Sequence, residues 1–459
     1  MDGASPMRAE ETRRTPVRIG WGVSRVVLAA AFVTTGGAAA SCSSSEDQRP
    51  DRSDAGSDAA SEAASEAGLD GTSVRDAGWA DAAPLPIVCA APPCATSLVT
   101  TLGADADDRS QGFCALLSDG TVACWGANGA GQLGRGDDAG TVDSARAARV
   151  VGLSDVVMLD HTCAVDKDGG VWCWGTGPFL LDDDAGALTT ELTPVKLDLP
   201  SATKVARGYA TACAAVESGI LCWGSNADAQ VKPLAATAGA MEPPRLIPIP
   251  QGAPVHAMAV GRATFVLRED GTLLTWGANP PLGRLSSIFP DPFPDSVALG
   301  GILMADLVHD NACMTAGGIG YCWGAPVFQS FLPQVPRALP EPVVTPEPIV
   351  QIATTRTHTI ENIGTQRYRW CAAAVSGALY CWGFNESGQA GDGTQDYVLD
   401  AVKVEGLPER VAQVKTTPDT TCALLTNGKV YCWGGNYNGQ LGNGLNRGRS
   451  FVPVEVVFP

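Results

Sequence analysis

Apolar and polar positions alternate in a short stretch near the end of the chain, and this pattern predicts a β-hairpin. Residues 422–444 read CALLTNGKVYCWGGNYNGQLGNG. An apolar run is followed by a three-residue loop ending in Gly428 and then by a second run ending in WGG. Glycine suits the third position because the common turn-plus-bulge hairpin needs a positive φ there. Pairing outward from this loop places Cys422 directly opposite Cys432, within reach of a disulfide.

Six further variants of the hairpin occur between residues 113 and 395. In five of them two cysteines again face each other. The spacing is ten residues in three copies and nine in two, which suits a loop one residue shorter. The predicted pairs are Cys114 with Cys124, Cys163 with Cys173, Cys213 with Cys222, Cys313 with Cys322, Cys371 with Cys381, and Cys422 with Cys432. In the remaining copy Phe265 and Thr275 occupy the cysteine positions.

A Trp-Gly dipeptide marks every copy and sets the period of the repeat. The tryptophans are residues 125, 174, 223, 276, 323, 382 and 433. A period near fifty residues with β-type alternation indicates a propeller or solenoid, because one such unit cannot bury both of its faces alone. Seven copies lie within the usual range of four to eight blades. We expect four strands in each unit, with the tryptophan packed between blades. We also expect the last strand, 451–457, to complete the first blade and close the ring.

The segments DGTVACWGANGAGQLGRGD and NGKVYCWGGNYNGQLGNG resemble the repeat of the regulator of chromosome condensation family. The resemblance covers 95–459 and is strongest in the first, sixth and seventh copies. In the third to fifth copies the GQLG element is lost or altered. The resemblance implies an all-β fold, a seven-bladed β-propeller.

The first 94 residues have a different composition. Several arginines precede an apolar run at 26–33 and a series of small residues that ends in AASC at Cys42. This order is typical of a secretory signal peptide, which we assign to residues 1–41. The AASC sequence resembles a bacterial lipobox and predicts acylation of Cys42; the alternative is an ordinary cleavage site beside a spare cysteine.

A segment rich in Ser, Ala, Gly and Asp follows Cys42. It holds almost no large apolar side chains, so it cannot bury enough surface to fold. We assign residues 42–94 to a lipid-anchored, acidic, disordered tether and residues 95–459 to the propeller. Cys89 and Cys94 remain after the hairpin pairs are assigned, and we predict a local disulfide between them rather than a metal site.

Charge and cysteine content indicate where the protein acts. The formal net charge of −18 opposes binding to nucleic acid. Fifteen cysteines, mostly at hairpin spacing, suit an oxidising compartment. Serine directly after Cys42 resembles lipoproteins sorted to an outer membrane. We therefore expect an exported monomer at the cell envelope, which contacts the membrane only through its lipid and binds no nucleic acid.

The chain shows no recognisable catalytic or metal-binding motif. None of its four histidines has the spacing of a helical zinc site. No nucleophile elbow, phosphate-binding loop or dinucleotide fingerprint follows a suitable strand. The sequence therefore predicts no catalytic residue, no metal and no cofactor.

One insertion is a candidate contact site. Residues 357–370 add about ten residues before the sixth hairpin and carry Arg367, Tyr368, Arg369 and Trp370. Arginine, tyrosine and tryptophan dominate binding hot spots. The alternative is that this insertion only packs as a loop.

The leading functional hypothesis is a non-enzymatic scaffold that binds an unidentified protein partner. The alternative is a carbohydrate-active or glycan-binding propeller whose site lies in the central funnel. That site would need carboxylates or basic groups converging from several blades. The family resemblance also implies nucleotide exchange on a small GTPase, which the acidity and the export signal disfavour.

Overall fold

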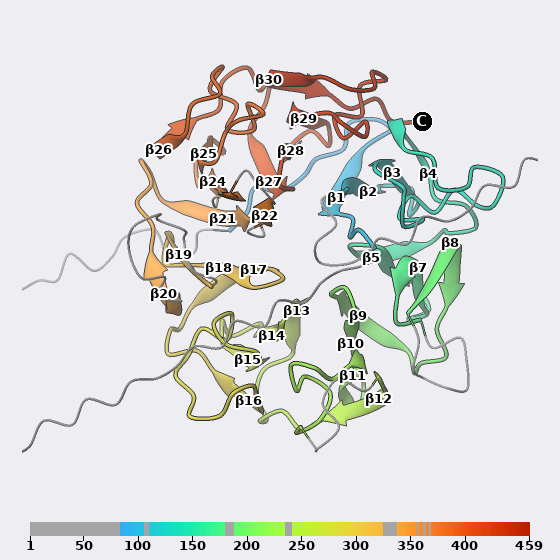
Figure 1. Ribbon diagram of the computed structural model, residues 1–459, viewed down its shortest axis with the longest axis vertical. Coiled ribbons are helices and arrows are strands. Elements are labelled where there is room, and N and C mark those ends of the chain that lie inside the picture. The colour runs from blue at the N-terminus through green and yellow to red at the C-terminus, as the bar shows by residue number, and fades with distance from the viewer. Residues whose placement is uncertain are drawn as a thin grey trace, which may run out of the picture. The chain divides into compact units, whose positions relative to one another are not determined.

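A computed structural model describes residues 83–104, 110–179, 188–234, 241–324, 337–355, 358–360, 364–366 and 369–459. All of them belong to the compact unit Thr72–Pro459. Within these residues every regular element is a β-strand, and seven four-stranded antiparallel sheets are arranged around a central axis (Figure 1). The predicted all-β, seven-bladed propeller is confirmed.

Each blade is a meander of four strands that runs from the axis outward. The innermost strands are β1 (Ala95–Thr100), β5 (Val156–Asp160), β9 (Ala202–Arg207), β13 (Val255–Val260), β17 (Ile302–Val308), β21 (Ile349–Thr354) and β27 (Val411–Thr416). The second strands are β2 (Gly112–Leu117), β6 (Cys163–Asp166), β10 (Thr211–Val216), β14 (Ala263–Arg268), β18 (Asn311–Ala316), β24 (Arg369–Ala374) and β28 (Thr420–Leu425). The third strands are β3 (Val122–Gly126), β7 (Val171–Gly177), β11 (Gly219–Ser225), β15 (Leu273–Gly277), β19 (Ile319–Gly324), β25 (Leu379–Gly383) and β29 (Val430–Gly435). The outermost strands are β4 (Ser144–Arg149), β8 (Thr189–Lys196), β12 (Met241–Ile247), β16 (Asp291–Ser296), β20 (Arg337–Pro342), β26 (Val398–Lys403) and β30 (Arg449–Glu455).

Blade 6 carries an insertion between its first two strands. A small hairpin, β22 (His358–Ile360) and β23 (Gly364–Gln366), forms a separate two-stranded sheet. It lies within the segment that the sequence identified as an insertion.

The hairpin registers agree with the sequence prediction. Cys422 is paired with Cys432 across β28 and β29, and the five other predicted cysteine pairs face each other in the same way. In the structure all six are disulfides with Cα atoms 4.1 Å apart. Cys89 and Cys94 are also bonded. In blade 4, which has no such pair, Phe265 faces Thr275 and both side chains are buried.

The repeated tryptophans join neighbouring blades, as the sequence predicted. All seven are buried. Six donate their indole N–H to a backbone carbonyl of the preceding blade at 2.7–3.0 Å, at residues 440, 132, 178, 230, 281 and 389. The glycine after the tryptophan allows a close approach. A Cβ on Gly434, for example, would lie 2.3 Å from the carbonyl oxygen of Asp419.

The closure of the ring differs from the prediction in one respect. The C-terminal strand β30 pairs with β29 as the outermost strand of blade 7, while blade 1 is complete with β1 to β4. The prediction that the last strand completes the first blade is therefore wrong. The reason is that the repeat starts at Ala95 with its own innermost strand, so no blade is divided between the two ends of the chain.

Side-chain contacts between whole blades close the ring instead. Figure 1 shows blade 7 in orange to red beside blade 1 in blue to teal. The side-chain oxygen of Gln413 in β27 accepts the Leu98 N–H of β1 at 2.8 Å. The Trp125 indole donates to the Gln440 carbonyl at 2.9 Å. Beyond β30 the chain packs Phe458 edge-on against the Trp125 ring, with centroids 5.8 Å apart.

Part of the segment assigned to the tether lies against blade 7. The Val88 N–H donates to the Thr426 carbonyl at 2.7 Å, and Ile87 packs on the apolar core between blades 7 and 1. The Ala95 N–H that begins β1 donates to Gly428 at 2.9 Å. The chain thus enters the propeller beside the hairpin turn of blade 7.

Candidate partner-binding face

The meander gives the propeller two different faces. Because the four strands of a blade alternate in direction, the connection from first to second strand and the connection from third to fourth strand lie at the same end. We call this end the loop face. The hairpin turns and the links between blades form the opposite end, the turn face. Residues 83–94 attach at the turn face, since Val88 and Ala95 bond to the turn at 426–428.

In blades 1, 6 and 7 the connection from third to fourth strand is held by hydrogen bonds of its own side chains. In blade 7 the Asn436 side-chain oxygen accepts the Leu441 N–H at 3.0 Å, and the Gln440 side-chain oxygen accepts the Asn438 N–H at 2.8 Å. The loops of blades 1 and 6 repeat both bonds. The GQLG element is therefore explained by loop geometry and by the tryptophan bond to the same loop, without a ligand.

Large apolar side chains are exposed on these loops. Six of the seven connections from third to fourth strand are described at least in part, and each exposes at least one large hydrophobic residue: Val142, Leu188, Leu234, Phe289, Tyr397 and Tyr437. The loop of blade 4 is the richest, since Leu285 is 79% exposed and Phe289 is 71% exposed. Large hydrophobic residues are exposed elsewhere too, for example Leu399 on β26 and Val344 in the link between blades 5 and 6. The loop face is distinctive because each of its six described loops supplies one, and exposed apolar groups of this kind are typical of interaction surfaces.

A groove of about 590 Å³ lies between blades 6 and 7 on the loop face. Its lining consists of Phe384, Glu386, Ser387 and Gln395 of blade 6 with Asp419, Tyr437 and Arg449 of blade 7. Tyr437 is 59% exposed, and its hydroxyl lies 3.5 Å from the Ser387 hydroxyl across the groove.

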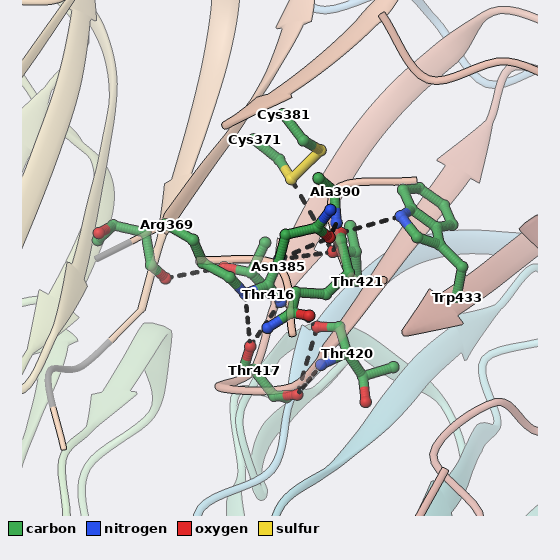
Figure 2. Close-up of a disulfide and its surroundings, with 12 residues drawn as sticks. Arg369, Cys371, Cys381, Asn385, Ala390, Thr416, Thr417, Thr420, Thr421 and Trp433 are labelled. Carbon is green, nitrogen blue, oxygen red and sulfur yellow. Dashed lines mark hydrogen bonds between the residues drawn. A yellow bond between two sulfur atoms is a disulfide. The ribbon is translucent and has the colours of Figure 1, made fainter. Parts of the chain in front are cut away.

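The predicted contact residue Arg369 is placed in the interior, beneath this groove. The side chain is 2% exposed. Figure 2 shows it among Thr417, Thr420 and Thr421, near the Cys371–Cys381 disulfide and Trp433. Its guanidinium donates to the Thr417 carbonyl at 2.5 Å, to the Thr421 hydroxyl at 2.7 Å, and also to the Thr420 carbonyl.

Burial lowers the pKa of the Arg369 guanidinium to about 9, and the Asp419 carboxylate opposes this shift. The prediction that Arg369 contacts a partner is therefore wrong, because its side chain is buried. Arg369 instead links blade 6 to the first loop of blade 7.

The other predicted contact residues have different positions. Trp370 is half-buried, and its ring stacks on Trp382 with centroids 5.9 Å apart. Arg367 and Tyr368 lie outside the described residues, as does Cys42, the predicted lipid anchor. The contact-site hypothesis therefore stays a prediction for those residues.

Sequence comparison identifies the repeat. A family model described as "Regulator of chromosome condensation (RCC1) repeat" matches residues 159–179 and 411–440, and a second model with that description matches residues 427–459. The chain therefore contains repeats of this RCC1 type. Among curated relatives, it is 28% identical to the ultraviolet-B receptor UVR8 of Arabidopsis thaliana over 75% of this chain and 68% of that protein. It is 24% identical to the mouse regulator of chromosome condensation, over 73% of this chain and 85% of that protein.

Solved RCC1-type structures have the same fold. Yeast RCC1 (Prp20), crystallised bound to Kap60, aligns with a TM-score of 0.58 and 18% identity over 74% of this chain and 85% of that one. Human WBSCR16 aligns with the same score and identity over 74% of this chain and 94% of that one. At this level of identity the likeness concerns the fold alone.

The central channel of this RCC1-type propeller does bring charged groups together. Asp160, Asp306 and Lys415 from three blades line a cavity of about 70 Å³. Asp160 accepts the Arg207 N–H of the next blade at 2.9 Å, and Asp306 accepts the Thr354 N–H at 3.1 Å. The carboxylates that a funnel site would need are therefore engaged in joining blades.

The lysine in the channel is also paired. The Lys415 ammonium lies 2.8 Å from Asp306. Burial opposes its charge, but the attraction and hydrogen bond of Asp306 outweigh burial and raise the pKa of Lys415.

Neither a metal centre nor a membrane-spanning helix is found in the part of the chain that the structure describes. Among those residues no group of three or more His, Cys, Asp or Glu side chains could hold a metal ion. No helix there is long and apolar enough to cross a membrane.

The sequence prediction missed the groove residues, although the RCC1 repeats contain a signal for them. Directly after the Trp-Gly dipeptide the other copies have Gly, Ala, Ser or Thr, whereas blade 6 has Phe384. The residue after the first asparagine of the loop, which is Asn436 in blade 7, also differs between blades. It is Gly129 in blade 1, Ala227 in blade 3 and Pro280 in blade 4, but Glu386 in blade 6 and Tyr437 in blade 7. Other blades form the same loop with different residues at these positions, so the side chains of Phe384, Glu386 and Tyr437 are not needed for folding.

Proposed function

We propose that this protein is an exported, lipid-anchored propeller that binds a protein partner through its loop face and has no catalytic activity of its own. The observation that carries the proposal is that each described loop from third to fourth strand exposes a large hydrophobic side chain, at the end opposite to the attachment of residues 83–94. A tether leaving from the turn face would direct the loop face away from the membrane.

Two further observations support the proposal. Similarity to proteins such as UVR8 and the mouse regulator of chromosome condensation favours a binding role for an RCC1-type propeller, and a yeast homologue was crystallised with the protein Kap60. Six hairpin disulfides and a seventh at Cys89 and Cys94 favour an oxidising compartment. The engaged carboxylates of the channel favour binding over hydrolysis.

Site-specific photocrosslinking tests the binding face. A photoreactive residue replaces Leu285, which is 79% exposed on the loop face, or Val344, which is 91% exposed in the link between blades 5 and 6 on the turn face. We expect a discrete protein adduct from position 285 and none from position 344 in the producing cells. Adducts from position 344 alone, or from neither position, would contradict the proposed face.

The anchor and the export are tested separately. We expect the Cys42→Ser variant to lose incorporated fatty acid and to leave the membrane fraction. Non-reducing peptide mapping should recover the hairpin cysteines as disulfides. Free hairpin thiols in protein isolated from cells would instead indicate a reducing compartment, and the export hypothesis would be rejected.

A further inference from the structure

The groove between blades 6 and 7 has the composition of a sugar site rather than that of a peptide site. None of its seven lining residues is Leu, Ile, Val, Met or Ala. It combines two aromatic rings, Phe384 and Tyr437, with two carboxylates, an amide, a hydroxyl and a guanidinium. A groove that takes the apolar face of a peptide helix is lined by aliphatic side chains, whereas four of the seven residues here are charged or carry an amide.

The tyrosine ring is held as a wall of the groove. A Cβ added to Gly435 would lie 3.0 Å from both the Tyr437 ring and the Asp419 Cβ, so the absence of a side chain at residue 435 lets these two groups lie side by side. The Gly435 N–H also donates to the Asp419 carbonyl at 2.7 Å. An exposed aromatic face beside a carboxylate is suited to a pyranose ring, whose C–H face packs on the aromatic ring while hydroxyls at its edge donate to the carboxylate.

Arg449 of blade 7 joins the two blades at the groove. Its guanidinium donates to the Gln395 side-chain oxygen at 2.7 Å and to the Glu386 carbonyl at 3.2 Å. The same guanidinium lies 5.2 Å from the centroid of the Phe451 ring. These contacts fix a cationic donor in place before any ligand arrives, and pre-organised polar groups of this kind set the orientation of a ligand.

The charges around the groove balance. Glu386 and Asp419 are matched by Arg449 in the wall and by the buried Arg369, whose charge the Asp419 carboxylate stabilises. Because the charges of the groove sum to about zero, a net charge on the ligand adds little to the binding free energy. The ligand is recognised instead by its hydrogen bonds and by its contact with the aromatic ring. Its volume of about 590 Å³ also falls within the range of about 300–1,000 Å³ that is usual for small-ligand pockets.

We propose that this groove binds an uncharged saccharide, with one pyranose ring packed on Tyr437 and its hydroxyls bonded to Asp419, Glu386 and Arg449. The site is distinct from the central funnel, where the carboxylates join blades. It does not depend on the proposed protein partner, whose strongest candidate surface is the loop of blade 4.

The test is a glycan array of neutral and charged oligosaccharides probed with the intact protein, followed by saturation-transfer NMR of the neutral compounds that bind. We expect binding to a neutral glycan that weakens about tenfold or more in Tyr437→Ala, because the ring contact is lost. Tyr437→Phe keeps the ring and should bind within about threefold of the parent protein. Tyr397→Ala removes an exposed tyrosine outside the lining and serves as the matched control.

Two further measurements separate sugar binding from charge attraction and misfolding. Binding should change less than about twofold between about 0.05 and 0.5 M salt, since the ligand is neutral. Gly435→Ala should weaken binding while leaving the melting temperature of the propeller near that of Tyr397→Ala. The proposal is overturned by an array without neutral binders, by unchanged binding in Tyr437→Ala, or by a groove that takes up peptides instead. None of these outcomes affects the crosslinking result at position 285.

Discussion

The interface between blades 7 and 1 can be tested at a single hydrogen bond, because Gln413→Leu removes the acceptor of a buried amide. The Gln413 side-chain oxygen is 2.8 Å from the Leu98 nitrogen, and the Leu98 residue is fully buried. Leucine is close to glutamine in size, so packing should be largely kept. A buried donor left without an acceptor costs about 1–3 kcal/mol, which corresponds to about a 5- to 150-fold change in an opening equilibrium.

Gln351→Leu is the matched control one interface earlier. The Gln351 side chain makes two bonds to Val414, accepting its N–H at 2.8 Å and donating to its carbonyl at 3.2 Å. We therefore expect this variant to cost more than Gln413→Leu. If the interface between blades 7 and 1 did not depend on the Gln413 bond to Leu98, Gln413→Leu would hardly change the stability of that interface, while Gln351→Leu would still destabilise the interface between blades 6 and 7.

Native-state hydrogen exchange is the suitable assay for this comparison. A ring of this size shifts its melting temperature only slightly for 1 kcal/mol, since the entropy of unfolding grows with chain length. Exchange instead reports the opening of the Leu98 amide itself. We expect Leu98 to lose about 5- to 150-fold of its protection in Gln413→Leu, with no comparable loss in blade 4. Unchanged protection of Leu98 would refute the reasoning that this side chain closes the ring.

Three further predictions follow from local features of the structure. Replacing both Cys422 and Cys432 by alanine should lower the free energy of unfolding in urea by about 3 kcal/mol, because the disulfide restricts the unfolded chain over a loop of this length. A change below about 0.5 kcal/mol, which is about the experimental error, would contradict this explanation. The hydrogen bond from Lys232 keeps the pKa of Glu242 below its ordinary value despite burial, and Arg245 adds to this effect. A carboxyl group whose pKa is lower in the folded than in the unfolded protein stabilises the fold above its unfolded pKa, here 4.5, and this contribution is lost as the pH falls through the folded pKa. The difference in unfolding free energy between the parent and Glu242→Gln should therefore be constant from about pH 6 to 8 and vanish at low pH. A difference that grows on acidification would contradict the sign. Deleting residues 456–459 leaves β30 intact but removes the buried Val456 and the contact of Phe458 with the first blade. We expect the free energy of unfolding in urea to fall by about 2–4 kcal/mol. An unchanged urea midpoint would show that this tail does not help to close the ring.

The sequence by itself determined the hairpins. Cys422 and Cys432 are ten residues apart, and the loop between them sets the register, so their pairing depends only on local chain geometry. The spacing of the tryptophans determined the number of blades for a related reason. Each blade contacts chiefly its neighbours, so a repeated sequence leads to a repeated structure.

Only the tertiary structure decided how the ring closes and where its surfaces lie. The bond from Leu98 to Gln413 joins residues 315 positions apart, and nothing near either residue in the sequence specifies the other. The groove places Glu386 of one blade beside Tyr437 of the next, although each lies at an ordinary variable position of its own loop. Arg369 resembled a surface residue because it follows an inserted loop, yet the fold turns it inward to the carbonyls of Thr417 and Thr420. The physical reason is that short-range geometry fixes each repeat, whereas contacts between repeats depend on where seven of them meet after folding.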